Sequence, residues 1–465
     1  MKLKSISLNH LYVEYPMSSL NFLYSQQNLQ EKADLIINEA IKMGASSAQV
    51  ELSESISTDV EILNQKIDNF ETSHENQLLI TVFKGHKKGN VGISSIDPKN
   101  LSYIIQQAID IATFTEEDSC NGILEKEFLA PKLEKNLELY KPQDISNEKL
   151  ISQAKDLELI ASNNSKIKSS DGSSVSMTHY NFVTANSNGF NDGYQTSRYS
   201  KYVSLIGETT DGMQTDYWYA SSRNFDNLDS NLFIAQKAQE RVLRRLNPSS
   251  ITTTTPVVVF ETQIAKSIIG SLMRAINGSS LYRKLSFLND SLGKLILPEW
   301  IEINENPFIK EGLSSCYFDN EGGQVTNRNI IENGRINGYL LSGYSARKLG
   351  MKPTGNSGGN HNLEISSNFS GGINDIAKEI NDGIVIIETI GHGLNMVTGD
   401  YSVGASGLVI KNGIITGFAD NLTIAGNMID IFKNISLISD DYTTGSILCG
   451  SMVINAGVIS VSGGK

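Results

Sequence analysis

Residues 165–222 read SKIKSSDGSSVSMTHYNFVTANSNGFNDGYQTSRYSKYVSLIGETTDGMQTDYWYASS, and this stretch decides the fold class. Short runs that suit strands are separated by pairs in which Gly follows Asp or Asn, the typical signal of a tight turn. These pairs are Asp171-Gly172, Asn188-Gly189, Asp192-Gly193 and Asp211-Gly212. The stretch therefore predicts an antiparallel meander. Its aromatic residues between 194 and 219 favour cross-strand pairing, with a groove for extended peptide as the alternative.

Towards the N-terminus, residues 28–114 predict an α/β-type unit of helix, strands and helix. Apolar residues recur with helical spacing in the first helix, which Gly44 ends. Four short strand patterns follow around residues 50–52, 60–62, 78–82 and 91–93, with Gly89-Asn90 as a turn. Asp97-Pro98 then predicts the start of a second helix. Residues 1–27 show no period and are interpreted as an extension.

Residues 115–145 are acidic and aperiodic, and we interpret them as a linker. The middle domain, 146–248, begins with a helix that Ser146 caps, continues through the meander and ends with a helix over 231–246. The last turn of that helix carries Arg241, Arg244 and Arg245. We interpret these arginines as cations that stabilise a helix C-terminus, in preference to an anion-binding site.

The remaining residues, 249–465, predict a large antiparallel β-rich domain with one clear helix near 262–276. Two stretches, 331–339 and 410–418, each place Asn-Gly at the centre and end on Gly followed by an aromatic residue. Asn-Gly favours the tight turn of a β-hairpin, because both positions tolerate positive φ. The predicted class is therefore α+β: an N-terminal α/β-type unit, a helix-plus-meander unit and a β-rich C-terminal domain.

The charge balance excludes some partners. The 465 residues include 39 Lys and Arg against 51 Asp and Glu, a formal net charge of -12. Nucleic acid and anionic membranes both attract basic surfaces, so neither is expected as a partner. Cys120, Cys316 and Cys449 are too few and too widely spaced for a disulfide scaffold. With no apolar run long enough to cross a membrane, we expect a cytoplasmic protein.

No local motif supplies a complete catalytic set. A helical zinc site needs two His about one turn apart and a Glu, and the chain has neither HExxH nor HExxxH. A metal site assembled by folding from His361, His392, Asp400 and Cys449 remains an alternative. Another is a serine hydrolase, because Gly355-Asn356-Ser357-Gly358-Gly359 matches the G-x-S-x-G pattern. The chain order Ser357, Asp382, His392 fits such an enzyme, although the flanking sequence does not predict strand–turn–helix.

Four blocks of sequence resemble signatures of the PmbA/TldE proteins in the TldD/PmbA peptidase family. They are SLYRK (280–284) continuing into FLNDSLGK (287–294), LSGYSARKLG (341–350), TGNSGGNHN (354–362) and TGDYSVGASG (398–407). Weaker similarity extends over residues 28–460. The order and spacing of the blocks make the resemblance specific.

The resemblance implies a function. Members of this family, also called modulators of DNA gyrase, form a heterodimeric metalloprotease that cleaves unfolded peptides in a closed chamber. The family is linked to peptide-antibiotic maturation and antitoxin degradation. Its TldD subunit holds zinc through an HExxxH helix and a C-terminal cysteine. The corresponding stretch here, 264–280, contains neither His nor Glu. The resemblance therefore implies a TldE-like, zinc-free subunit, with zinc in a TldD-like partner.

We accordingly expect no cofactor in this chain, a TldD-like partner, unfolded peptide as substrate, and a homodimer as the alternative in isolation. Cys449 is expected to be a small buried side chain. The expected contacts with peptide or partner are Tyr282, Arg283, Lys284, Tyr344, Arg347, Asn356, His361 and Asp400. A structural role, such as Asp400 binding turn amides or Arg347 pairing in a seam, is the alternative for each. A self-sufficient hydrolase (through Ser357, or a metal at His361, His392 and Cys449) and a binding protein without a protease partner remain alternative functions.

Overall fold

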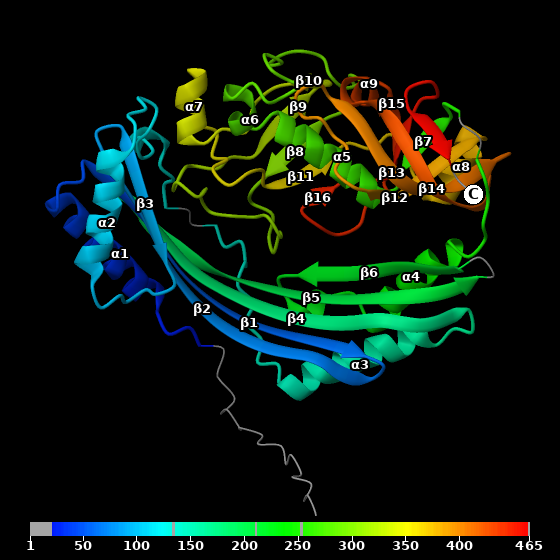
Figure 1. Cartoon of the computed structure of the whole chain (residues 1–465), viewed down its shortest axis with the longest axis horizontal. Helices are drawn as coiled ribbons and strands as arrows, with labels where there is room; N and C mark the ends of the chain where they lie inside the picture. Colours follow the sequence, from blue (N-terminus) through cyan, green and yellow to red (C-terminus); the bar gives the residue numbers. More distant parts are fainter. Residues whose placement is uncertain (1–20, 133–134, 210–211, 252–253, 464–465) are drawn as a thin grey trace, which may run out of the picture.

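The computed structural model describes residues 21–132, 135–209, 212–251 and 254–463 (Figure 1). Its strands form three sheets, and its helices lie on or between them. The mixed α+β class expected from the sequence is confirmed. Of the extension predicted over 1–27, residues 1–20 lie outside the described residues.

The largest feature is a long, curved, six-stranded antiparallel sheet (Figure 1). In spatial order its strands are β3 (Lys87–Ile93), β2 (Lys66–Lys84), β1 (Ser47–Leu63), β4 (Ile167–Asn186), β5 (Asn191–Thr209) and β6 (Gly212–Ser222). The pairing of β1 with β4 joins the strands expected in the N-terminal and middle domains into one sheet. The meander predicted over 165–222 is confirmed as β4, β5 and β6.

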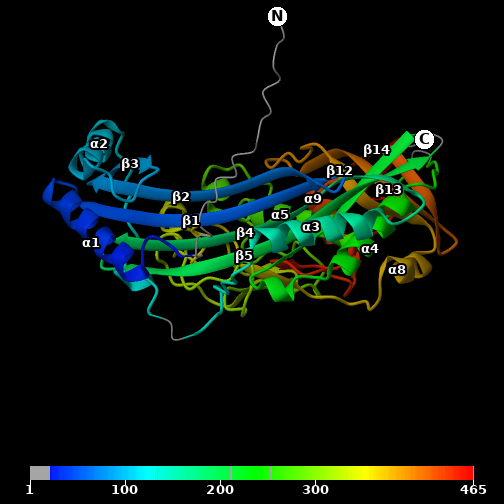
Figure 2. The ribbon, with the colours of Figure 1, turned by 90° about the horizontal axis from the view of Figure 1, so that it is seen from below.

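Helices cover one face of this sheet (Figure 2). They are α1 (Gln26–Lys42), α2 (Leu101–Phe114), α3 (Asn147–Ser162) and α4 (Asn231–Arg244). Side chains alternate between faces along a strand, and Val50 and Val60 of β1 point to the same face. Val50 packs with α1 and α2, and Val60 packs with α3 and α4. The opposite face is thereby turned towards the C-terminal part of the chain (Figure 1).

Several local predictions at strand and turn level were wrong. β1 is one continuous strand, not two. Gly89 lies inside β3, where it packs so closely on α2 that an added Cβ would lie 2.0 Å from the Ala108 carbonyl oxygen. The turn is at Gly85 instead, which has φ 60°. In the meander, Asn188-Gly189 makes a hairpin turn, whereas Asp192 lies within β5.

The other two predicted turns of the meander have different outcomes. Asp171-Gly172 is a bulge within β4, where the register with β5 shifts. Asp211 lies outside the described residues.

The helix caps were predicted with mixed success. Ser146 caps α3 by accepting a hydrogen bond from the Lys149 N–H, as expected. The N-cap of α2 is Asn100, not Asp97. The Asp97 carboxylate instead accepts a hydrogen bond from the Tyr24 hydroxyl and pairs with Lys32. Asp97 therefore ties the start of the described chain to the segment before α2.

The C-terminal part contains the other two sheets. In spatial order, the five-stranded sheet consists of β10 (Arg335–Ile336), β9 (Arg328–Glu332), β8 (Ile303–Asn306), β11 (Asn362–Ile365) and β16 (Ile447–Leu448). The seven-stranded sheet consists of β15 (Ile435–Ile438), β17 (Met452–Ile454), β7 (Val257–Phe260), β12 (Gly383–Ile390), β13 (Asp400–Lys411), β14 (Ile414–Asn427) and β18 (Ser460–Gly463). Their pairings are antiparallel except β7–β12 and β11–β16.

A large apolar core lies between these two sheets. The remaining helices are α5 (Thr262–Ala275), α6 (Gly278–Tyr282), α7 (Gly343–Leu349), α8 (Ile373–Ile380) and α9 (Met428–Lys433), and short 3₁₀ turns are η1 (Lys126–Phe128) and η2 (Phe225–Asn227). α5 confirms the helix predicted near 262–276. Both Asn-Gly hairpins are also confirmed, with φ of 50° and 69° at Asn333-Gly334 and 49° and 74° at Asn412-Gly413.

The segment 115–145 runs between α2 and α3 and contacts the C-terminal part. The Ala130 N–H donates to the Gly322 carbonyl, and the Leu137 N–H donates to the Tyr317 hydroxyl oxygen. We retain the division into 28–114, the linker 115–145, 146–248 and 249–465 as a proposal, in which one sheet spans the first two domains.

Candidate functional site

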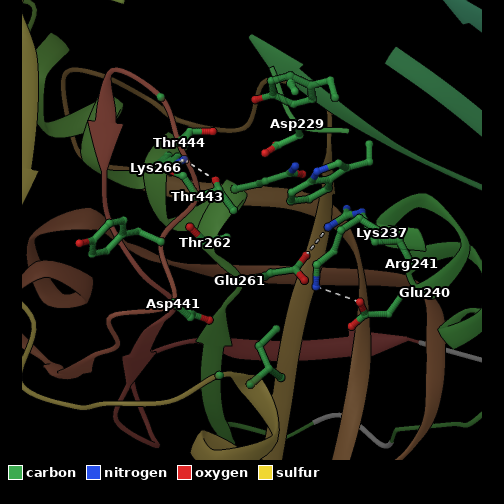
Figure 3. Close-up of a pocket in the computed structure, with 18 of the residues that line it drawn as sticks. Asp229, Lys237, Glu240, Arg241, Glu261, Thr262, Lys266, Asp441, Thr443 and Thr444 are labelled. Carbon is green, nitrogen blue, oxygen red and sulfur yellow. Dashed lines mark hydrogen bonds and ion pairs between the residues drawn. The ribbon is translucent and has the colours of Figure 1, made fainter. Parts of the chain in front are cut away.

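A cavity of about 950 Å³ lies where β6, the last strand of the long sheet, meets the C-terminal domain (Figure 3). Its walls come from β6, α4, the start of α5, the start of α8 and the loop 441–447. This size is typical of ligand sites in proteins, and residues from distant parts of the chain converge there. The cavity is therefore our candidate functional site.

The wall of the cavity contains a cluster of buried ion pairs. Arg241 bonds to Asp216 (Nε–Oδ1 2.9 Å) and to Glu261 (Nη1–Oε2 3.0 Å). Arg244 forms a second pair with Glu261, at 2.6 and 2.9 Å (Figure 3 shows Arg241 and Glu261). Burial raises the pKa of Glu261, but the two guanidinium groups outweigh it and hold that pKa below its usual value. Glu261 is therefore an ionised partner of two arginines.

The cluster continues to the seven-stranded sheet. Arg245 bonds to Asp216 (Nε–Oδ2 2.8 Å) and to Glu388 of β12 (Nη1–Oε2 2.7 Å). Burial also opposes ionisation of Asp216, and Arg241 and Arg245 outweigh it, so the pKa of Asp216 is lowered. The arginines end α4 as predicted, but their partners are internal carboxylates. The cluster contains three arginines and three carboxylates, so their charges balance. Because these carboxylates come from both the long sheet and the C-terminal domain, the arginines join the two.

Lys266 of α5 projects into the cavity from the opposite wall. Its ammonium donates to the carbonyl and to the hydroxyl oxygen of Thr443, at 3.0 and 2.7 Å (Figure 3). Burial lowers the pKa of Lys266, and the nearby Cys449 acts in the other direction. Thr262, at the start of the same helix, donates from Oγ1 to the Cys449 carbonyl at 2.7 Å. Lys266 and Thr262 therefore flank Cys449.

These side chains do not fit a zinc ion. Zinc in proteins is bound by thiolate, imidazole and carboxylate. Cys449 is fully buried, and burial raises the pKa of its thiol to about 12, so the thiol is neutral. Its neighbours on α5 offer a hydroxyl group and an ammonium group, and α5 contains no His and no Glu. An ammonium group repels a divalent cation.

The metal site considered from the sequence is not assembled. Within the ranges that the structure describes, no group of three or more His, Cys, Asp and Glu side chains could hold a metal ion. His361 is nearly buried, with Nε2 2.9 Å from the Gly355 carbonyl oxygen and Nδ1 3.3 Å from Cys316 Sγ. His392 is exposed after the end of β12. His361, His392 and Cys449 therefore belong to different environments.

The serine-hydrolase arrangement is also not formed. Ser357 lies in a loop that leads into β11, where a nucleophile elbow would lead into a helix. Its N–H donates to Asp319 Oδ2 at 2.9 Å. Asp382 and His392 flank opposite ends of β12, so the eight residues of that strand separate them. An extended strand of this length spans about 26 Å, too far for a triad.

Three of the predicted contact residues form a cluster at α6 and α7. The rings of Tyr282 and Tyr344 meet edge to face, with centroids 5.5 Å apart. Arg283 lies over the Tyr282 ring and donates from Nε to its hydroxyl oxygen at 2.9 Å. Lys284 follows, exposed and with φ 57°. This cluster can be reached from solvent, whereas the cavity is lined by other residues.

The remaining predicted contact residues bond to their own chain. Arg347 donates to the carbonyls of Cys120 and Gly122, at 2.7 and 2.9 Å. Asn356 is buried and accepts from Arg328 at 2.8 Å. His361 is described above, and Asp400 is exposed and accepts from Thr398 and Asn427. These contacts match the structural roles kept open from the sequence, and a contact role for them stays a prediction.

Sequence reasoning did not single out Lys266, Asp216, Glu261 or Glu388. Lys266 lies in a helix, Asp216 and Glu388 lie in strands, and Glu261 directly precedes a helix. Nothing in the local sequence distinguishes these residues. Only folding brings these charges around one cavity. One feature of the sequence could have indicated a buried ion pair. Asp216 is an acidic residue on the buried face of β6, which otherwise carries the apolar Trp218 and Ala220. In the described part of the chain, no helix is both long and apolar enough to span a bilayer.

The fold and the site define a class of protein: a long antiparallel sheet, covered by helices on one face, meets a β-rich domain around a polar cavity. Family models for three domains of PmbA/TldA metallopeptidases match in chain order: domain 1 at residues 48–112, the central domain at 140–246 and the C-terminal domain at 252–461. The chain therefore belongs to the PmbA/TldD family of metallopeptidases, as a PmbA/TldE-type member. The resemblance stated from the four sequence blocks is confirmed.

Relatives match over nearly their whole length. The chain is 37% identical to a metalloprotease PmbA homolog of Haemophilus influenzae, covering 92% of this chain and 96% of the relative. It is 35% identical to the metalloprotease PmbA of Escherichia coli O157:H7, covering 94% and 97%. A solved structure from Bacteroides thetaiotaomicron, described as a modulator of DNA gyrase, has a TM-score of 0.88 at 24% identity and 94% and 99% coverage. TldE from Thermococcus kodakarensis has a TM-score of 0.81 at 20% identity, with 93% and 100% coverage.

Proposed function

We propose that this chain is the non-catalytic, zinc-free subunit of a heterodimeric TldD–TldE-type metalloprotease that cleaves unfolded peptides in the cytoplasm. The observation that supports it most is the surroundings of Cys449: a neutral buried thiol beside the Lys266 ammonium and the Thr262 hydroxyl. The carboxylates nearby are Asp441 and Glu261, of which Glu261 is bound by Arg241 and Arg244, and no group of three or more metal ligands forms there in the described residues. The zinc of the family would then be held by a TldD-like partner.

In this proposal the chain shapes the space in which peptide is held. Zinc in the partner would polarise the scissile carbonyl, and the partner's Glu would activate water. This chain's own contribution is a stiff wall: the ion pairs of Arg241, Arg244 and Arg245 hold the long sheet against the C-terminal domain. A fixed wall limits the positions that a bound peptide can take, which favours reaction over diffusion away.

The cluster of half-buried Tyr282 and Tyr344 with exposed Arg283 is the part of the predicted contact set that we propose for the partner. Aromatic residues and arginine are enriched where protein surfaces bind one another. Lys284 extends the cluster. For Arg347, Asn356, His361 and Asp400 the proposal is indirect: their hydrogen bonds hold the loops that carry the contact surface.

The test is partner-dependent proteolysis. Casein and a labelled unfolded peptide are incubated with the chain alone, with the TldD-like protein from the same genome alone, and with both. The proposal predicts cleavage that requires both proteins and is unchanged by Ser357→Ala. Cleavage by the chain alone, lost in Ser357→Ala, would show a self-sufficient serine hydrolase instead. Cleavage by the partner alone at the full rate would leave this chain without the proposed role.

A further inference from the structure

Most charges that line the cavity are already paired. Glu261 binds Arg241 and Arg244, and Lys237 binds Glu240 at 2.9 Å. The other carboxylates are engaged as well: Asp375 with Lys378, and Asp441 with the N–H and hydroxyl of Ser451. Asp229 differs: burial raises its pKa, and Lys201 acts in the other direction. The carboxylates of the wall other than Asp229 therefore have an ion pair or hydrogen bond within the described chain.

Two cations on the wall have no carboxylate partner. Across the described ranges, neither Lys266 nor Arg198 has an ion pair. Two hydrogen bonds from Lys266 go to Thr443, so one of its three N–H groups remains for a ligand. Lys266 is half-buried, so its ammonium has already lost part of its hydration, and this burial lowers its pKa. Binding of an anion therefore requires less further desolvation of this ammonium than of a fully hydrated lysine.

The cavity also borders a strand edge with aromatic side chains. β6 is the last strand of the long sheet, and Tyr219 of β6 lines the cavity. Tyr217 and Tyr202 continue from it, with ring centroids 6.4 Å from Tyr219 to Tyr217 and 5.5 Å from Tyr217 to Tyr202. All three are more than a third exposed. A strand edge offers backbone groups, and aromatic rings offer side-chain contacts, to an extended chain.

We propose that this cavity binds a carboxylate of an extended peptide, with Lys266 and Arg198 as its cationic partners and the peptide lying along β6 over Tyr219 and Tyr217. The choice of a peptide rests on the proposed function, whereas the choice of a carboxylate rests on the two unpaired cations. The carboxylate can be that of the peptide's C-terminus or of an acidic side chain. Either source makes the same charge-assisted hydrogen bonds.

The experiment measures binding to the isolated full-length chain, without a partner and without proteolysis. Three octapeptides of Ala, Ser and Leu carry a fluorescent label at the N-terminus, and fluorescence anisotropy gives their affinities. The first has a free C-terminal carboxylate, the second a C-terminal amide, and the third a C-terminal amide and an internal Glu. We expect the free acid to bind about tenfold more tightly than the amide, a difference of about 1.4 kcal/mol, because a hydrogen bond to a charged group is stronger than one to a neutral group.

Variants assign the difference to the cavity. Lys266→Met should bring acid and amide to the same affinity, whereas Lys237→Met should keep the difference. Lys237 is the matched control because it lines the same cavity but is paired with Glu240. Tyr219→Ala should weaken all three peptides equally. Circular dichroism melts confirm that the variants fold.

The outcomes are decisive in each direction. The inference is overturned if neither the free acid nor the amide that contains Glu binds the unmodified chain more tightly than the plain amide, if such a difference survives in Lys266→Met, or if no peptide binds. Tight binding of the amide that contains Glu supports the inference and assigns the carboxylate to a side chain. None of these results bears on zinc or on partner-dependent cleavage, so the proposed function stands or falls separately.

Discussion

Two of the places at which the C-terminal domain contacts the rest of the molecule differ in their chemistry. The first, the α4 junction, consists of Asp216, Arg241, Arg244, Arg245, Glu261 and Glu388. The second, the α7 junction, consists of Asp118, Glu321, Tyr344, Arg347 and Lys348. The α4 junction is mostly buried and pairs charge with charge. The α7 junction is more exposed, and its arginine binds mainly backbone carbonyls.

The difference shows how a buried and an open contact between domains are stabilised. A buried charge needs its counter-charge. Separating the arginines of α4 from Glu261 and Glu388 would therefore leave both the guanidinium groups and the carboxylates without a partner. Carbonyls at an exposed seam can bind water instead, so Arg347 is replaceable at small cost. We therefore expect the α4 junction to hold the geometry of the cavity and the α7 junction to tolerate change.

The largest expected effect is at the α4 junction. Arg241→Met removes the side chain that bridges Asp216 and Glu261 and leaves one negative charge without a buried counter-charge. We expect the free energy of unfolding to fall by about 3 kcal/mol, the lower end of the range for breaking a buried ion pair, because Arg244 and Arg245 still contact the carboxylates. Urea denaturation measures the change.

The matched control is Arg274→Met on the exposed face of α5, where the arginine reaches only Ser271 within its own helix. It should change the free energy of unfolding little. A loss at Arg241 no larger than at Arg274 would show that the α4 junction does not stabilise the fold through its buried charges.

The second effect is a pH response that separates the junctions. Burial raises the pKa of Glu321 to about 7, although its Oε2 accepts a hydrogen bond from the Gly343 N–H at 2.7 Å. Since the folded pKa lies above the unfolded one, this group's contribution is present below pH 4.5 and is lost as the pH rises towards 7. Asp216 and Glu261 have lowered pKa values, so their contribution is lost as the pH falls.

Glu321→Gln keeps the acceptor for Gly343 and removes the titration. The fall in the free energy of unfolding between pH 4.5 and 7.5 should be smaller in this variant by on the order of 2 kcal/mol. Urea denaturation at a series of pH values measures it. An unchanged pH profile would mean that Glu321 titrates normally in the folded chain.

The smallest effect is expected at the half-buried arginine of the α7 junction, Arg347. Arg347→Met removes the hydrogen bonds to Cys120 and Gly122 and the ion pair with Glu125. We expect a loss of about 1 kcal/mol in the free energy of unfolding, because water can replace the guanidinium at these acceptors. Lys348→Met, which removes an exposed ion pair with Asp118, is the control and should change less. A loss equal to that of Arg241→Met would remove the distinction between the junctions.

The sequence predicted the fold well where a local rule determines the structure. The Ser146 cap of α3, the helical spacing of α5 and the Asn-Gly hairpins follow from local geometry. It failed where a tertiary contact overrides that rule. Gly89 marks close packing of β3 on α2, and Asp97 binds Tyr24 and Lys32 from the start of the described chain.

The site was less predictable for the same reason. The absence of His and Glu on α5 could be read from the sequence, but the cavity could not, because β6, α5 and the loop 441–447 are far apart along the chain. The arginines of α4 were visible, whereas their partners were not: Asp216, Glu261 and Glu388 lie 17 to 143 residues from the arginines that they bind. Only the three-dimensional structure distinguishes paired arginines from the unpaired Lys266.

The measurement that tests the account most directly is the zinc content of the isolated chain. The protein is incubated with one equivalent of zinc, dialysed, and analysed by mass spectrometry of the metal, beside Lys266→His and Cys449→Ser variants. A zinc-free subunit should hold far less than one zinc per chain in the unmodified protein and no less in Cys449→Ser, and only Lys266→His, which adds an imidazole, should hold more. One tightly held zinc per chain that is lost in Cys449→Ser would contradict the account, because the neutral thiol beside Lys266 would then be a metal ligand.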